Sequence, residues 1–111
     1  MTTRINEVNT LTQAPNPSKM HDYRMHLRAI TDGLVEMAKA AGRSKYTCNQ
    51  LLRECYNLID AELKTYEQWK EEGAYVRRGE HAYLFWGKPV RNDHGIRYFP
   101  VEFRFCREQV R

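Results

Sequence analysis

Aromatic and basic side chains are crowded together in one short stretch of the chain, RRGEHAYLFWGKPVR. Its aromatic and basic members include Arg77, Arg78, Tyr83, Phe85, Trp86, Lys88 and Arg91. Aromatic rings can stack on nucleobases, and arginine or lysine can neutralise phosphate, so this mixture is typical of a surface that binds nucleic acid. The same aromatics could instead fill a hydrophobic core, with the basic residues forming its solvated rim. The remainder of the chain must decide between these two interpretations.

The net charge of the chain is concentrated in the same region. The chain has 111 residues and a formal net charge of +4. Residues 1–72 hold ten basic and ten acidic residues, whereas residues 73–111 hold eight basic and four acidic residues. Eight of the thirteen aromatic residues also follow residue 72. Charge asymmetry that coincides with aromatic enrichment points to an anionic partner, and the pI near 9.1 argues against an acidic mimic of DNA.

Patterns that would indicate catalysis or metal binding are not found in the sequence. The four histidines lack metal-ligand spacing, and neither H-E-x-x-H, a phosphate-binding loop nor a G-x-S-x-G elbow is present. Cys48 and Cys55 are expected as buried thiols on a helix, and no C-x-x-C pair occurs. The N-terminal residues lack a signal-peptide core. We therefore expect a cytoplasmic protein that is not an enzyme and has no cofactor, metal, membrane or small-molecule partner.

Hydrophobic periodicity predicts the helices that precede the aromatic stretch. Residues 1–18 are rich in Thr, Asn and Pro and are interpreted as a flexible leader, with residues 19–111 as a single domain and Ser18 as a cap. Apolar residues recur at intervals of three and four from Met20 to Ala41, which predicts an amphipathic helix ending at Gly42. The capping-box patterns T-C-N-Q and T-Y-E-Q begin a second helix, whose apolar stripe runs to Leu63, and a short third helix that stops at Gly73.

Beyond Gly73 the period changes to two, which is typical of strands. A short strand is expected over residues 74–76, then a tight R-R-G-E turn with Gly79 at positive φ, and a strand over residues 81–86. N-D-H-G, residues 92–95, predicts a hairpin loop before a last strand with Phe99, Val101, Phe103 and Phe105 on one face. Strand 81–86 is apolar on both faces, so one face is left over after the helices have packed on the other. Trp69 is expected beneath the sheet.

This order of elements predicts an α+β domain: two amphipathic helices and a short third helix, followed by a small antiparallel β-meander of three to four strands.

Four motifs follow one another in the second half of the chain: T-Y-E-Q-W-K-E-E-G, V-R-R-G-E-H-A, F-W-G-K-P-V and Y-F-P-V-E-F-R-F-C-R-E-Q-V. Their order resembles the N-terminal domain of ArdC-type antirestriction proteins, over residues 47–111. The resemblance implies an α+β domain that binds single-stranded DNA and is carried by plasmids, phages and conjugative elements. Such relatives usually add a zinc metallopeptidase-like domain with H-E-x-x-H, which this sequence lacks, so no peptidase activity is carried over. Cys106 stands where the family pattern leads us to expect a polar residue.

Both lines of reasoning predict a module that binds nucleic acid. The resemblance further implies that it is a stand-alone single-stranded-DNA-binding module of a mobile genetic element, with an antirestriction or DNA-protection role. The residues expected to contact DNA are Arg77, Arg78, Tyr83, Trp86, Lys88, Arg91, Arg97, Tyr98 and Arg104. Tyr83, Trp86 and Tyr98 would stack on bases, and the basic residues would meet phosphates. The alternative is a protein-interaction module of a conjugative or phage system. It would use the leftover aromatic face or the apolar seam of the first helix, for example in a homodimer.

Overall fold

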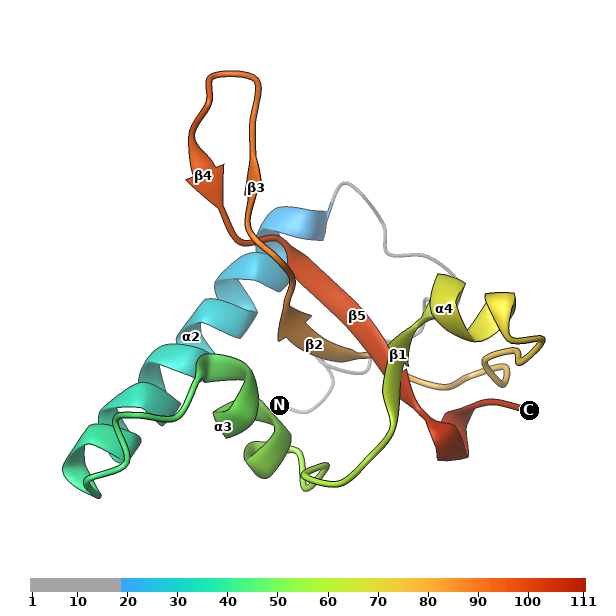
Figure 1. The fold of residues 1–111 in the computed structure, drawn as a ribbon, viewed down its shortest axis with the longest axis horizontal. Coiled ribbons are helices and arrows are strands. Elements are labelled where there is room, and N and C mark those ends of the chain that lie inside the picture. The colour runs from blue at the N-terminus through green and yellow to red at the C-terminus, as the bar shows by residue number, and fades with distance from the viewer. Residues whose placement is uncertain (1–18) are drawn as a thin grey trace.

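The computed structural model describes residues 19–111, so the predicted leader and the predicted Ser18 cap lie outside the described residues. Over that range the chain forms helices and antiparallel strands, which confirms the α+β class (Figure 1). The helices are α2 (Met20–Ala40), α3 (Cys48–Cys55), α4 (Tyr66–Glu71) and the 3₁₀ turn η2 (Arg107–Gln109). The strands are β1 (Leu63–Thr65), β2 (Tyr83–Trp86), β3 (Val90–Arg91), β4 (Arg97–Tyr98) and β5 (Val101–Cys106).

Helix α2 buries the apolar face that its periodicity predicts, with one change near its end. Tyr23 and Leu27 are completely buried, but Met37 is 68% exposed and Ala38 faces the core in its place. A strict alternation of three and four residues averages 3.5 per turn, whereas a straight helix has 3.6, so the buried stripe drifts along the helix. Ala38 lies eleven positions after Leu27, which is close to three full turns.

Helix α3 begins where predicted but ends sooner. The capping box is present: Thr47 Oγ1 accepts from Gln50 N–H at 3.1 Å, and Thr47 N–H donates to Gln50 Oε1 at 2.7 Å. The helix stops at Cys55, and Asn57 takes a positive φ of 62°. The guanidinium of Arg53 then binds the carbonyls of the following segment, including that of Leu58 at 3.0 Å. The predicted continuation of the helical stripe to Leu63 is therefore wrong.

This early ending changes two predicted burials. Cys55 is exposed rather than buried in a helical stripe, and Cys48 is half-buried. Leu63 belongs to β1, a strand that the sequence analysis did not predict. The three residues of β1 pair with the last strand, with Leu63 opposite Cys106. The segment between α3 and α4 is consequently part of the sheet.

The main sheet has the order β1-β5-β2, with all neighbours antiparallel and β5 in the centre. β3 and β4 form a separate two-stranded ribbon that projects away from the rest of the molecule (Figure 1). The chain turns at residues 92–95 as predicted, and Gly95 N–H donates to the Asn92 carbonyl at 2.9 Å. The β-meander is thus split between two small sheets.

The expected strand over residues 74–76 is not formed as predicted. Val76 makes an isolated bridge with Val110 near the end of the described chain, flanked by a bond from Arg77 N–H to the Gln109 carbonyl at 2.8 Å. The R-R-G-E turn is present, closed by a bond from Glu80 N–H to the Arg77 carbonyl at 3.2 Å, and Gly79 has φ 87°. The turn connects this bridge to β2 instead of forming a hairpin with it.

Both faces of β2 are covered by the chain itself. Leu84 and Phe85 point to opposite faces of the strand, and both are buried. The Tyr56 ring lies 5.5 Å from the Phe85 ring in an edge-on arrangement, and the Tyr56 hydroxyl donates to the Leu84 carbonyl at 2.9 Å. The second apolar face of β2, for which the sequence predicted no cover, is therefore closed by Tyr56, the residue that follows α3.

A second core cluster surrounds Trp69, which is buried beneath the sheet as predicted. It packs with Ala82, Phe105 and Val110, and its indole N–H donates to the Phe105 carbonyl at 2.9 Å.

Candidate functional site

The structure separates the predicted DNA-contacting residues into three groups. Trp86 ends β2, and Lys88, Arg91, Arg97 and Tyr98 lie on the ribbon or the segment leading to it. Arg77 and Arg78 are exposed in the turn before β2. That segment lies toward α4 and the C-terminus, at the opposite end of the sheet from the ribbon (Figure 1). Tyr83 and Arg104 form the third group, paired across the β2–β5 register.

The third group contributes to packing. Tyr83 is half-buried, its ring lies 5.3 Å from that of Tyr56, and burial raises the pKa of its phenol. The Arg104 guanidinium lies 4.7 Å from the centre of the Phe85 ring. The same guanidinium group binds Glu102 at 2.7 Å. Arg104 already has an anionic partner, so it is not a free phosphate contact.

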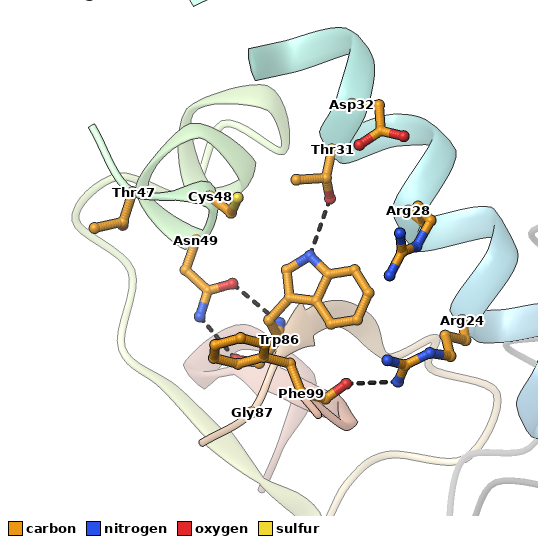
Figure 2. A pocket seen from close by; sticks show the side chains of 10 residues that line it. All are labelled: Arg24, Arg28, Thr31, Asp32, Thr47, Cys48, Asn49, Trp86, Gly87 and Phe99. Atoms are coloured by element: carbon orange, nitrogen blue, oxygen red, sulfur yellow. Dashed lines mark hydrogen bonds between the residues drawn. The ribbon is translucent and has the colours of Figure 1, made fainter. Parts of the chain in front are cut away.

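A hollow of about 610 Å³ opens beside Trp86, between α2, the start of α3 and the end of β2. We call it the Trp86 groove. Arg24, Arg28 and Asp32 line it in a row along α2, next to the indole, and the ring of Phe99 borders it as well (Figure 2). None of these four residues was predicted from the sequence to belong to a site.

The indole of Trp86 is held in a fixed position in the groove (Figure 2). The Asn49 side chain binds its backbone in both directions, donating to the Trp86 carbonyl at 2.8 Å and accepting from the Trp86 N–H at 3.0 Å. The indole N–H donates to Thr31 Oγ1 at 3.1 Å, while that hydroxyl donates to the Leu27 carbonyl at 2.7 Å. The capping box at Thr47 sets the first turn of α3, and so it places Asn49 against the strand.

Arg24 connects α2 to the base of the ribbon. Its guanidinium donates to the Phe99 carbonyl and lies 5.5 Å from the centre of the Trp86 ring and 5.6 Å from that of Tyr98. These distances allow cation–π attraction to both rings. Arg28, one turn further along α2, is exposed and forms no ion pair within residues 19–111. Arg24 therefore positions the aromatic rings, and Arg28 presents a free cation.

Phe99 is 50% exposed, which corrects the prediction that it lies on the core face of the last strand. β5 begins only at Val101, because Pro100 separates it from β4. The Pro100 carbonyl accepts from Gly87 N–H at 2.8 Å, and a Cβ at Gly87 would lie 3.2 Å from Pro100 Cγ. Phe99 thus lies between the two strands and borders the groove, while Tyr98, the last residue of β4, is 38% exposed.

A second hollow of about 660 Å³ lies along Trp86 and Gly87 and also borders Asn49. Its charged lining consists of Lys88 and the Glu102–Arg104 ion pair. Lys88 is exposed and forms no ion pair within the described part of the chain. A chain of anionic groups lying along Trp86 would therefore meet Lys88 on this side.

Two arginines concentrate positive charge on the ribbon, and neither forms an ion pair within residues 19–111. Arg91 and Arg97 are directly opposite each other in the β3–β4 register, and both are exposed. Like charges at directly opposed positions destabilise an antiparallel pair, and an anion bound between them would relieve that repulsion. Arg91 donates to the Gly95 carbonyl at 2.9 Å, and Asp93 is the acidic residue of the loop. The groove and the ribbon together present aromatic faces within a positive field.

The arrangement suits stacking and anion binding. Among residues 19–111, no group of three or more His, Cys, Asp or Glu side chains is placed to hold a metal ion. None of the described helices combines the length and the apolar character that a membrane span requires.

The sequence did indicate that Arg24 and Arg28 share a helix face, because they lie four positions apart beside the apolar seam of the first helix. Nothing in the local sequence connects Asn49 with Trp86.

Comparisons of the chain with protein-family models, with curated proteins and with solved structures find no match. The resemblance to the ArdC-type N-terminal domain therefore rests on the quoted motifs and stays a prediction.

Proposed function

We propose that this protein binds single-stranded DNA through the Trp86 groove and the adjoining β3–β4 ribbon. The observation that carries the proposal is the groove itself, where exposed Phe99 and half-buried Trp86 lie beside the free cation of Arg28. Stacking on aromatic faces contributes about 1–3 kcal/mol per base and requires bases that are not already paired. A duplex offers the same phosphates but keeps its ring faces covered. The arrangement thus favours single strands.

The proposed interface keeps five of the residues predicted from sequence and adds others. Trp86, Lys88, Arg91, Arg97 and Tyr98 remain in it. Arg28 and Phe99 join as direct contacts, with Arg24 as a positioning residue. Arg77 and Arg78 lie at the other end of the sheet, and Tyr83 and Arg104 are engaged in packing, so we assign them no contact with the strand.

The biological setting that we propose comes from the motif order alone. A role in a plasmid, phage or conjugative element, in protecting incoming DNA or opposing restriction, fits a module that binds single strands without a strong sequence code.

The first test is a titration of labelled single-stranded and duplex oligonucleotides by fluorescence anisotropy, with tryptophan emission followed in parallel. We expect tighter binding of the single strand, accompanied by quenching. Trp69 is completely buried, so the quenching should come from Trp86 and should be absent in Trp86→Phe while binding is retained in part. Equal affinity for both nucleic acids with no quenching would show that only charge is sensed. No binding at low salt would refute the proposal.

The alternative is a protein partner. The two surfaces that the sequence suggested for it, the seam of the first helix and the second face of β2, are occupied within the chain. Tyr23 and Leu27 of the helix seam are completely buried within the chain, and Tyr56 covers the second face of β2. An interaction with protein would instead use the ribbon, where Ile96 is 62% exposed and Val90 is also exposed. Self-association in sedimentation that Ile96→Ser abolishes, together with no affinity for DNA, would favour this alternative.

A further inference from the structure

We infer that the Trp86 groove is a pocket for a single nucleobase and that it selects guanine through Asp32. This inference rests on the proposed function and specifies the substrate of the same site.

The aromatic walls of the groove suit one planar base. The indole of Trp86 is fixed by Asn49 at the backbone and by Thr31 at its N–H, so it offers a ring in a defined position. The Phe99 ring borders the same hollow and is half exposed. A ring that is already held loses little freedom when a base stacks on it, which favours binding.

Most of the polar groups in the groove are already used within the protein. The Thr31 hydroxyl accepts from the indole and donates to the Leu27 carbonyl, and both ends of the Asn49 amide bind the Trp86 backbone. Arg24 is engaged with the Phe99 carbonyl and with two aromatic rings. The charged side chains that remain to contact a base are those of Arg28 and Asp32. The other polar groups of the lining are the Thr47 hydroxyl, which caps α3, and the Cys48 thiol.

Asp32 lies on the same face of α2 as Arg28, one turn further along, and its carboxylate borders the groove (Figure 2). It is exposed, and it forms no ion pair within residues 19–111. Its charge attracts Arg28, one turn away, and repels phosphate, so its contact with a bound strand would be with a base. Its two oxygens can accept a pair of parallel hydrogen bonds.

The hydrogen-bond pattern of the bases then decides the selectivity. On its Watson–Crick edge, guanine presents two adjacent donors, the ring N1–H and the exocyclic N2 amine, which match the two oxygens of a carboxylate. Adenine and cytosine present an amine next to a ring nitrogen that only accepts, and thymine presents one N–H between two carbonyls. Each of these three would hold an acceptor against Asp32, where it is repelled. Arg28 is left to neutralise the adjoining phosphate.

The test uses oligothymidylate strands of about 12 nucleotides in which the central base is dT, dG, dA, dC or deoxyinosine. We expect the dG strand to bind about fivefold to tenfold more tightly than the dT strand. This is the lower part of the range for a bidentate contact, because the groove is open to solvent. Deoxyinosine keeps N1–H but lacks the N2 amine, so it should be intermediate. In Asp32→Asn the ratio of dG to dT affinity should fall to about one.

Asp93→Asn is the matched control, because it removes the same charge from the loop of the ribbon, outside the groove. It should keep the dG preference of the original chain. A charge effect shared by all strands cancels in the ratio, so the ratio reports on base contacts only. Equal affinity for all five strands would overturn the guanine inference while leaving single-strand binding intact. A dG preference that survives in Asp32→Asn would overturn the role of Asp32, and no binding of any strand would refute the proposed function itself.

Discussion

The salt dependence of single-strand affinity can be worked out from the charges around the Trp86 groove. Four exposed basic residues surround the groove and the ribbon and form no ion pair within the described residues: Arg28, Lys88, Arg91 and Arg97. Each phosphate neutralised on a single strand contributes about −0.7 to the slope of log affinity against log salt concentration. Four contacts give a slope of about −2.8, so affinity should fall about 50-fold between 50 and 200 mM salt.

The perturbation is the double variant Arg91→Ala/Arg97→Ala. Removing two contacts should reduce the slope to about −1.4, so the same change in salt lowers affinity only about sevenfold. The ribbon should tolerate the change, because the two arginines directly opposite each other repel, and the exposed bond from Arg91 to the Gly95 carbonyl is the contact that is lost. The matched control is Arg77→Ala/Arg78→Ala, which removes the same formal charge from the turn before β2, and its slope should stay near −2.8.

The assay is fluorescence anisotropy with a labelled oligothymidylate at several salt concentrations from 50 to 200 mM, with thermal melting of each variant to confirm that it is folded. The reasoning would be refuted if both double variants lowered the slope equally. That outcome would mean that the strand senses the net charge of the whole protein rather than contacts on the ribbon. A slope near zero in the original chain would exclude phosphate contacts altogether.

Two further predictions concern stability. Gly79→Val should destabilise the fold by about 1–2 kcal/mol, because Gly79 has φ 87° although a Cβ there would meet nothing within 4 Å. Urea denaturation checks this, and unchanged stability would contradict the turn. Burial raises the pKa of the Tyr56 phenol above its ordinary value of 10.0. The neutral phenol therefore stabilises the fold fully below pH 10, and this contribution is lost as the pH rises above 10. Tyr56→Phe should lower the free energy of unfolding by about 1 kcal/mol at neutral pH, because the hydrogen bond to the Leu84 carbonyl is lost. The variant should also lose less stability than the original chain when the pH is raised, which denaturation at about pH 8 and pH 11 measures. An alkaline loss as large as that of the original chain would point to another group.

Local signals predicted the ends of several elements correctly. Both capping boxes, at Thr47 and Thr65, are formed, and the first helix ends just before Gly42. Each of these signals acts over three or four residues, so all the residues that interact lie within one short segment of the sequence. The N-D-H-G loop and the α+β class were predicted for the same reason, since turn chemistry and hydrophobic period are read over short windows.

The failures occurred where contacts beyond the reach of a cap or a turn decide the local structure. The apolar stripe of the second helix continues in the sequence, but the chain leaves the helix, with Asn57 at positive φ and Arg53 binding the carbonyls of the segment that follows. Leu63 is a strand residue only because β5 offers its edge for pairing. Alternation placed Phe99 in the core, but β5 begins only at Val101, and Phe99 lies before it with 50% of its surface exposed.

The sequence by itself determined the kinds of side chain available for binding: a basic, aromatic second half that follows a neutral first half. The tertiary structure alone decided which of them meet. The bonds that hold Trp86 come from Asn49, 37 residues earlier, and Thr31, 55 residues earlier. Such contacts depend on how α2 and α3 pack against the sheet, and no local propensity encodes that packing. The same packing buried Phe85, which the pattern of aromatics could not distinguish from a surface residue.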